Sequence, residues 1–374
     1  MHLNLREKNK KDTEVAQPRT LSGIDALYFH IEVPYEDYSE FYNKIILTDT
    51  LSNSDNFSLS GHSAAGTKQY TYYSVNSYEM ESNLFDGSDH RERQLASIGF
   101  KNLNQKDNLP SIFVQMSTIA MSFLGYKESY SAVLEVIRGL GIPILGTKVN
   151  RLDLNTYVFG HSFDYLRYKL FSTKMRMSKE TVGYDTIYNQ EGLQTFYLGT
   201  RGSSGIYMRI YNKMLEIQSK YHEGGSLKLG IICDKYELKY KEKLSSVDIW
   251  NVEFELKREE LKRYGIDTVE DVWKYSDSMH KDITQNRIRL IDPKRGKKRE
   301  CPTSFIWSII SNNYSVFKDN VSPLSPEKCK VYNLTSEQRL INHCNAYLDD
   351  VFKSSSFNSS KIQDVKNLIA SLSK

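Results

Sequence analysis

Three segments of this chain alternate chemically capable side chains with apolar ones, and this pattern limits the fold more than any other feature. The segments cover residues 148–158, 206–213 and 249–258. A period of two is typical of β-strands, because successive side chains of a strand point to opposite faces of the sheet. The sequence therefore predicts three strands that each have one apolar and one polar face.

If the apolar sides of these strands bury a common core, their polar sides meet on the other face of one sheet. The polar sides carry acids, cations, amides and tyrosines, an inventory that suits phosphoryl transfer. The residues are Arg151, Asp153 and Asn155 in the first strand, Tyr207, Arg209, Tyr211 and Lys213 in the second, and Asn251, Glu253, Glu255 and Lys257 in the third.

Three of these side chains are candidate metal ligands. Asp153, Glu253 and Glu255 offer hard oxygen atoms, which suit Mg²⁺ or Mn²⁺. Such an ion can polarise a scissile phosphate and neutralise the charge that develops on it. We therefore expect a divalent cation as the cofactor on this face.

Tyr211 is the candidate nucleophile. A tyrosine hydroxyl has an ordinary pKa of about 10 and attacks poorly unless nearby cations favour the phenolate. Arg209 and Lys213 flank it on the same face, and Arg209 can also grip phosphate oxygens with two hydrogen bonds. Attack on a DNA phosphate would leave a phosphotyrosyl bond and a free 3′ hydroxyl, from which replication can prime.

A purely structural interpretation is also possible, because an antiparallel sheet with one solvent-exposed face shows the same alternation without any catalytic role. Taken alone, the pair Glu253 and Glu255 is typical of a solvated face, and Tyr211 is typical of a surface tyrosine. The 26 tyrosines of the chain are also typical of sheet surfaces, although bases can stack on such rings. Only the combination of the three strands favours a catalytic site.

Composition excludes few classes of protein. The formal net charge of +4 neither requires nor excludes a nucleic-acid partner. The N-terminus lacks the apolar core of a secretory signal, and no window reaches the ~20 apolar residues of a membrane span. The cysteines form no C-x-x-C pair, so we expect reduced thiols in a cytoplasmic protein that does not contact membranes. They are Cys233, Cys301, Cys329 and Cys344.

A basic loop is predicted over residues 287–299, where Arg287, Arg289 and five further cations lie close together around Pro293 and Gly296. Such a loop is most often solvated, and contact with phosphates is the second interpretation. Its other cations are Lys294, Arg295, Lys297, Lys298 and Arg299.

The remaining pattern predicts alternating strands and helices after a flexible arm over residues 1–20. Further strands are expected at 25–33, 70–74, 111–116 and 195–200, helices at 126–140, 162–179, 269–283, 336–353 and 361–372, and a loop at 47–67.

Four motifs, in this order, resemble the replication initiation factor family, which includes initiators of small rolling-circle plasmids, filamentous-phage initiators and some relaxases. They cover residues 149–154, 197–201, 208–213 and 250–258. The resemblance extends over about 21–291 and implies an α+β fold, with a central antiparallel sheet flanked by helices. We expect this region to be the nicking endonuclease domain, followed at 292–374 by the basic loop and a small C-terminal helical region.

The resemblance implies that Tyr211 is the nucleophile and that acids of the flanking strands hold the metal. Many relatives carry a second acid four positions after Asp153, where this chain has Tyr157, so the ligand set stays open. The cations expected to contact DNA are Arg151, Arg201, Lys257, Lys294, Arg295, Lys297, Lys298 and Arg299.

The function expected from these features is a rolling-circle initiator that nicks one strand at an origin and later religates it. The partners expected are origin DNA, a second copy of the chain and, from the family alone, a host helicase. A relaxase of a conjugative element would use the same chemistry, and a non-catalytic DNA-binding regulator on the same fold is a third hypothesis. A tyrosine recombinase is disfavoured, because its His-x-x-Arg pattern occurs only at His90 and Arg93, in a polar segment far from Tyr211.

Overall fold

The structure is a computed structural model. It describes residues 17–46, 57–62, 69–77, 94–103, 109–175, 178–185, 190–201, 205–219, 225–244, 248–294 and 296–317. Most of these belong to one compact unit, Met1–Lys262 with Ile266–Pro323, and the second unit consists of Arg263–Gly265 with Leu324–Lys374.

A ten-stranded sheet dominates the described part of the chain, and all of its neighbouring strands are antiparallel. The order across the sheet is β2-β3-β4-β5-β1-β6-β11-β10-β9-β8. The strands are β1 (Arg19–Glu32), β2 (Phe57–His62), β3 (Tyr70–Ser77), β4 (Gln94–Lys101), β5 (Ile112–Met116), β6 (Gly146–Phe159), β8 (Ser178–Asp185), β9 (Gln190–Leu198), β10 (Ile206–Asn212) and β11 (Ile249–Lys257).

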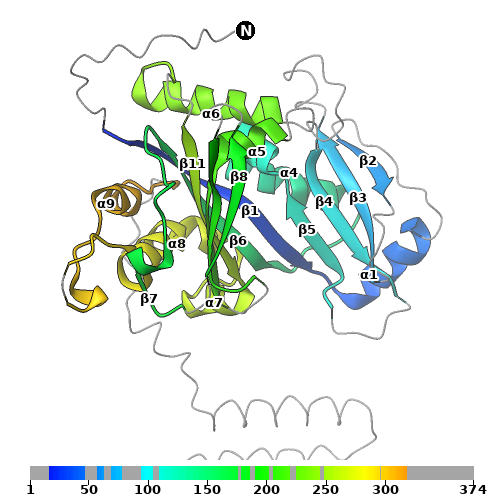
Figure 1. Ribbon diagram of the computed structural model, residues 1–374. Coiled ribbons are helices and arrows are strands. Elements are labelled where there is room, and N and C mark those ends of the chain that lie inside the picture. The colour runs from blue at the N-terminus through cyan, green and yellow to red at the C-terminus, as the bar shows by residue number, and fades with distance from the viewer. Residues whose placement is uncertain are drawn as a thin grey trace, which may run out of the picture. The chain divides into compact units, whose positions relative to one another are not determined.

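A small second sheet pairs β7 (Phe171–Thr173) with β12 (Ile288–Leu290). Figure 1 shows β2 to β5 as one wing of the large sheet and β8 to β11 on its other side, with the long strands β1 and β6 between them. The predicted α+β class with a central antiparallel sheet is therefore confirmed.

Helices and short helical turns surround the sheet. The α-helices are α1 (Tyr35–Phe41), α3 (Thr118–Phe123), α4 (Tyr126–Gly139), α5 (Lys213–Ser219), α6 (Gly225–Tyr240), α7 (Arg258–Arg263), α8 (Val269–Asp282) and α9 (Phe305–Asn312). The shorter turns are η1 (Tyr42–Ile46), η2 (Tyr168–Leu170), η4 (Ile283–Arg287) and η5 (Lys298–Glu300).

The apolar face of the sheet packs against α4, α8 and α9. The ring of Phe254 on β11 packs against the rings of His280 on α8 and Trp307 on α9, with 5.5 Å and 6.3 Å between the ring centres. Phe29 of β1 contacts Tyr130 on α4 at 5.5 Å. Each large apolar side chain buried in this layer stabilises the fold by about 2–3 kcal/mol. The apolar face is thus the main core, which leaves the other face of the sheet for polar chemistry.

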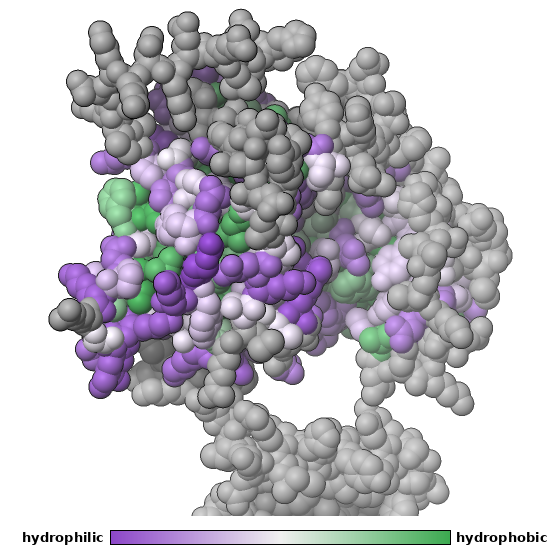
Figure 2. All heavy atoms as spheres, viewed as in Figure 1, coloured by the Kyte–Doolittle hydropathy of each residue, from purple (hydrophilic) through white to green (hydrophobic). Residues whose placement is uncertain are grey.

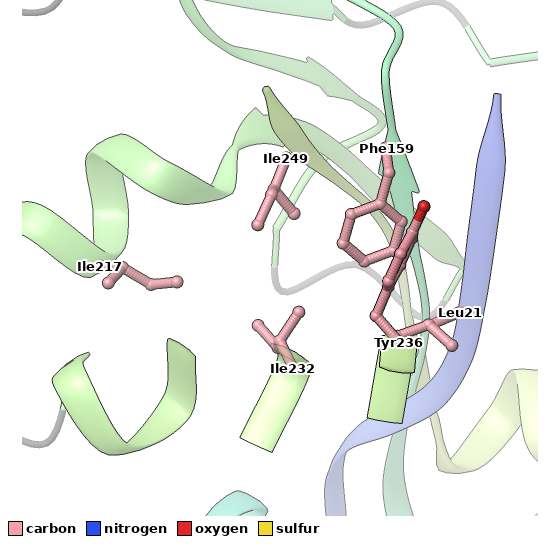
Figure 3. Close-up of a cluster of buried hydrophobic side chains, with 6 residues drawn as sticks. All are labelled: Leu21, Phe159, Ile217, Ile232, Tyr236 and Ile249. Carbon is pink, nitrogen blue, oxygen red and sulfur yellow. The ribbon is translucent and has the colours of Figure 1, made fainter. Parts of the chain in front are cut away.

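A smaller apolar cluster anchors α5 and α6 at one end of the polar face. Figure 3 shows Ile217 of α5 and Ile232 and Tyr236 of α6 gathered around Phe159. The other members are Leu21 and Ile249.

Several strands and helices differ from the sequence-based prediction. The segment 162–179 was expected to be helical but contains only the turn η2 followed by the strands β7 and β8. The buried residues Phe163, Leu166 and Phe171 are spaced three and five apart, which does not keep one helix face buried. Strand β2 lies inside the predicted loop 47–67, and both β4 and α6 were not foreseen.

The helices at 126–140 and 269–283 are confirmed as α4 and α8, and Thr268 and Asp271 form a capping box at the start of α8. The helices predicted at 336–353 and 361–372, the pair His90 and Arg93, and all of the arm but residues 17–20 lie outside the described residues. No helix in the described part of the chain is long and apolar enough to cross a membrane.

Candidate functional site

The three strands singled out by their alternation lie side by side as β6, β11 and β10. Glu255 pairs with Asp153 on one side and with Tyr207 on the other, and Glu253 pairs with Arg209. Residues at the same register on neighbouring strands point to the same face. The register of the sheet therefore brings the polar side chains of the three strands together on one face, as predicted.

Tyr211 lies at the centre of a hydrogen-bond network on this face. Its hydroxyl donates to Glu253 Oε2 at 3.2 Å and accepts from Asn251 Nδ2 at 2.8 Å and from Lys213 Nζ at 3.5 Å. Asn155 joins the network by donating to Asn251 Oδ1 at 3.3 Å. The tyrosine oxygen thus has a carboxylate that can take its proton and a cation that can stabilise the phenolate.

The environment of Tyr211 differs from the sequence-based expectation of two activating cations. Arg209 forms an ion pair with Glu253 and lies with its guanidinium 5.9 Å from the centre of the Tyr211 ring. Burial raises the pKa of Tyr211 well above its ordinary value, Lys213 lowers it, and the charge of Glu253 raises it. In this arrangement the phenol holds its proton and donates it in the hydrogen bond to Glu253.

Lys213 is the first residue of α5 rather than the last residue of β10. The turn from strand to helix buries its side chain, which is 1% exposed, and places Nζ 2.5 Å from Glu216 Oε2. The ammonium also lies 5.7 Å from the centre of the Tyr157 ring. Lys213 therefore reaches Tyr211 from the helix and not as the next side chain along the strand.

The carboxylates of the face are held by arginines. Asp153 accepts from Arg151 Nε at 2.8 Å, and Glu255 Oε2 lies 3.1 Å from Arg151 Nη2. Burial raises the pKa values of both Asp153 and Glu253 above the usual carboxyl range. The arginines oppose this effect, because Arg151 lowers the pKa of Asp153 and Arg209 lowers that of Glu253.

Asp25 is a fourth acid of this cluster, and the sequence analysis did not identify it as a site residue. The register between β1 and β6 shifts between Ile24 and Ala26, so Asp25 is the extra residue of a β-bulge opposite Asp153. Its charge raises the pKa values of Glu253 and Tyr211, after the effect of burial. The spacing of three between the buried residues Ile24 and Leu27 is the sequence signal that could have revealed the bulge.

The donor chemistry of this face fits a divalent cation. Carboxylate oxygens are the ligands that Mg²⁺ and Mn²⁺ prefer. Oδ1 of Asp25 is buried and has no hydrogen-bond partner among the described residues, as expected of an oxygen that a cation would satisfy. No group of three or more His, Cys, Asp or Glu side chains within the described ranges is arranged to hold an ion. A bound metal would therefore replace arginine contacts of Asp153 or Glu253.

The cations expected to contact DNA fall into two groups. Arg151, Arg201 and Lys257 surround Glu255, and the side chain of Arg201 is 66% exposed. Lys298 instead lies beside β7, where its Nζ donates to Phe171 O at 3.3 Å. Lys294, Lys297, Lys298 and Arg299 are exposed, whereas Arg295 lies outside the described residues.

The predicted basic loop begins later than expected, because Arg287 and Arg289 belong to η4 and β12. Arg287 pairs with the buried Glu260, and Arg289 donates to Cys301 O. These two arginines therefore connect the region of the small sheet with α7 and with the segment before α9. Figure 2 shows hydrophilic side chains gathered at the lower left of the described surface, where Figure 1 draws the loop ahead of α9.

No protein-family model matches this chain, and no curated protein sequence matches it. Among solved structures, a rolling-circle replication initiator protein from Geobacillus stearothermophilus is similar, with a TM-score of 0.42 and 11% sequence identity. The alignment covers 78% of this chain and 96% of that chain. A likeness at this level leaves the function to be inferred from the side chains of the site.

Proposed function

We propose that this protein is a rolling-circle replication initiator that nicks one DNA strand at an origin and later religates it. The observation that carries the proposal is the hydrogen bond from the Tyr211 hydroxyl to Glu253, beside Lys213 and on the same face of the sheet as the acids of β6 and β11. A nucleophile, a proton acceptor and a nearby cation are the parts that covalent catalysis at a phosphate requires.

The proposed reaction starts with Tyr211. Its oxygen attacks the scissile phosphorus while its proton passes to Glu253 Oε2, which already accepts the hydrogen bond at 3.2 Å. The bond from phosphorus to the 3′ oxygen breaks, and that oxygen takes up a proton to become the 3′ hydroxyl primer. The phosphate stays on the tyrosine at the 5′ end, and attack by a 3′ hydroxyl reverses the step during religation.

Arginines and the divalent cation would handle the phosphate charge. Arg209 and Arg151 can exchange their carboxylate partners for phosphate oxygens, because both are planar donors that suit either anion. Asp25, Asp153, Glu255 and the Oε1 atom of Glu253, which does not receive the tyrosine proton, supply the oxygens from which Mg²⁺ or Mn²⁺ would be held. When bound, the metal supplies charge neutralisation at the phosphate.

Asp25→Asn is expected to weaken the binding of Mn²⁺ by about tenfold, because the amide lacks the charge of the carboxylate. Isothermal titration of Mn²⁺ into the DNA-free protein measures this directly. Asp234→Asn, at an exposed position of α6, is the matched control and should bind as the wild type does. Unchanged affinity in Asp25→Asn would exclude Asp25 from the ligand set.

The proposal itself is tested with supercoiled plasmid that carries the replication region found beside the gene, incubated with Mg²⁺ or Mn²⁺. The expected product is a nicked circle with the protein covalently attached to the 5′ end. Tight binding without a nick, on a plasmid whose origin is confirmed, would favour the non-catalytic regulator instead.

A relaxase would give the same nicked product, so the two functions differ in the DNA that is recognised. The exposed cations Lys294, Lys297, Lys298 and Arg299 suit contact with phosphates around the origin, as the neighbouring Arg295 would. We further propose that two copies of the chain act together, since one nucleophile serves one strand transfer, and that a host helicase unwinds the nicked DNA.

A further inference from the structure

Aromatic rings form a row across the polar face of the sheet, beginning beside the acid cluster. The ring centres of Tyr28 on β1 and Phe113 on β5 lie 6.2 Å apart. Those of Phe113 and Tyr70 on β3 lie 6.3 Å apart, and those of Tyr70 and Tyr72 lie 6.0 Å apart. All four side chains are partly exposed. The row is therefore a surface feature that neither the core nor the proposed reaction uses.

The sheet register places this row on the same face as the catalytic candidates. Tyr28 pairs with Arg151 of β6 and with Gln115 of β5. Arg151 connects the two regions directly, since it binds Asp153 while its guanidinium lies 5.1 Å from the centre of the Tyr28 ring. The aromatic row is thus continuous with the site around Tyr211.

A glycine shapes the far end of the row. Gly99 of β4 lies between Phe113 and Tyr72 in the register. A Cβ atom at Gly99 would lie 2.7 Å from Tyr72 Cε1, so the Tyr72 ring occupies the space that a side chain would fill. The absence of a side chain here keeps the rings in one shallow layer that a flat ligand can cover.

The charge of this wing suits an anion. Strands β3, β4 and β5 contain no aspartate or glutamate, and their one charged residue is Lys101. Lys101 pairs with Tyr70 in the register, and Arg151 lies at the other end of the row. Along these three strands a phosphate backbone would therefore meet a cation at each end of the rings and no carboxylate.

We propose that this row, Tyr28, Phe113, Tyr70 and Tyr72, binds a segment of single-stranded DNA that continues into the Tyr211 site. Unpaired bases expose their faces for stacking on aromatic rings, whereas a duplex hides them. From β10 to β3 there are six interstrand spacings of about 4.8 Å, or roughly 30 Å, which suits a few nucleotides. The proposal rests on the proposed function, since it supplies the strand that Tyr211 cuts.

The test measures binding without cleavage, in the Tyr211→Phe background and in EDTA. Fluorescence anisotropy compares a labelled oligothymidine of about 20 nucleotides with a duplex of equal length. Phe113→Leu and Tyr72→Leu are each expected to weaken single-strand binding about tenfold and to leave duplex binding within about twofold. Phe305→Leu, on a ring of α9 that is 62% exposed, is the control and should change neither.

Ser97→Glu is a third variant, which changes the charge of this face and leaves the aromatic rings in place. Ser97 lies on the same face, paired with Gln115, so a carboxylate there should repel the DNA backbone at low salt and much less at high salt. Unchanged single-strand affinity in all three variants, with circular dichroism that reports a folded protein, would overturn the proposal and leave the rings as sheet-stabilising pairs. Single-strand binding that depends on the rings, in a wild-type protein that does not nick its origin, would overturn the proposed function alone.

Discussion

Tyr211→Phe is expected to lower the rate of nicking by at least about 10⁴-fold and to abolish the covalent adduct, because the ring keeps its place but loses the attacking oxygen. DNA affinity should stay within about twofold of the wild type, since the face keeps its cations. The measurement is gel analysis of supercoiled plasmid after incubation with Mn²⁺, together with detection of protein-linked DNA.

Tyr207→Phe is the matched control, since Tyr207 lies on the same strand and face but pairs with Glu255 instead of contacting Glu253. It should nick as the wild type does. Cleavage that survives in Tyr211→Phe and disappears in Tyr207→Phe would transfer the role of nucleophile to Tyr207.

His280 is expected to make the protein sensitive to acid. Its ring is buried and stacks on the ring of Tyr314, with 3.7 Å between the ring centres. Neither ring nitrogen has a hydrogen-bond partner within the described structure. Burial lowers the pKa of His280 from 6.5 to about 3. Between these values the unfolded chain binds a proton that the folded chain does not, so acidification favours unfolding.

From pH 6.5 to 4.5 this one group should lower the free energy of unfolding by about 2 kcal/mol. Urea denaturation of the wild type and of His280→Phe at both pH values measures the difference, in which the effects of other groups cancel. The variant should lose about 2 kcal/mol less than the wild type. Equal losses in both proteins would mean that His280 is charged or open to water in the fold.

The sheet region around the candidate site could be predicted because its signal is local and repeated. Alternation at 148–158, 206–213 and 249–258 determines which side chains of each strand share a face, and the three strands indeed lie side by side in one sheet. The pairing of Glu255 with Asp153 depends on the register of β11 against β6, which alternation alone does not determine. The expected roles of Tyr211 and of the metal ligands stay predictions.

The parts that were missed depend on contacts between distant segments. Asp25 joins the cluster through a bulge in β1, which only the pairing with β6 makes visible. The raised pKa of Tyr211 depends on how deeply the sheet and α5 bury it, and a strand pattern carries no information on depth. Segment 162–179 is not helical, because β7 within it pairs with the distant strand β12, a contact that local sequence does not report.

The position of β11 bears on when activity can arise during synthesis. It lies between β6 and β10 in the large sheet, yet it is the last of that sheet's described strands in the sequence. Pairings of such high sequence separation form late in folding, because a long loop must close before any contact repays its entropy. A nascent chain that ends before residue 249 has Tyr211 but not the glutamate expected to take its proton. If the proposed function holds, the order of the strands delays nuclease competence until β11 has emerged from the ribosome, and chains that end before it are expected not to cut DNA.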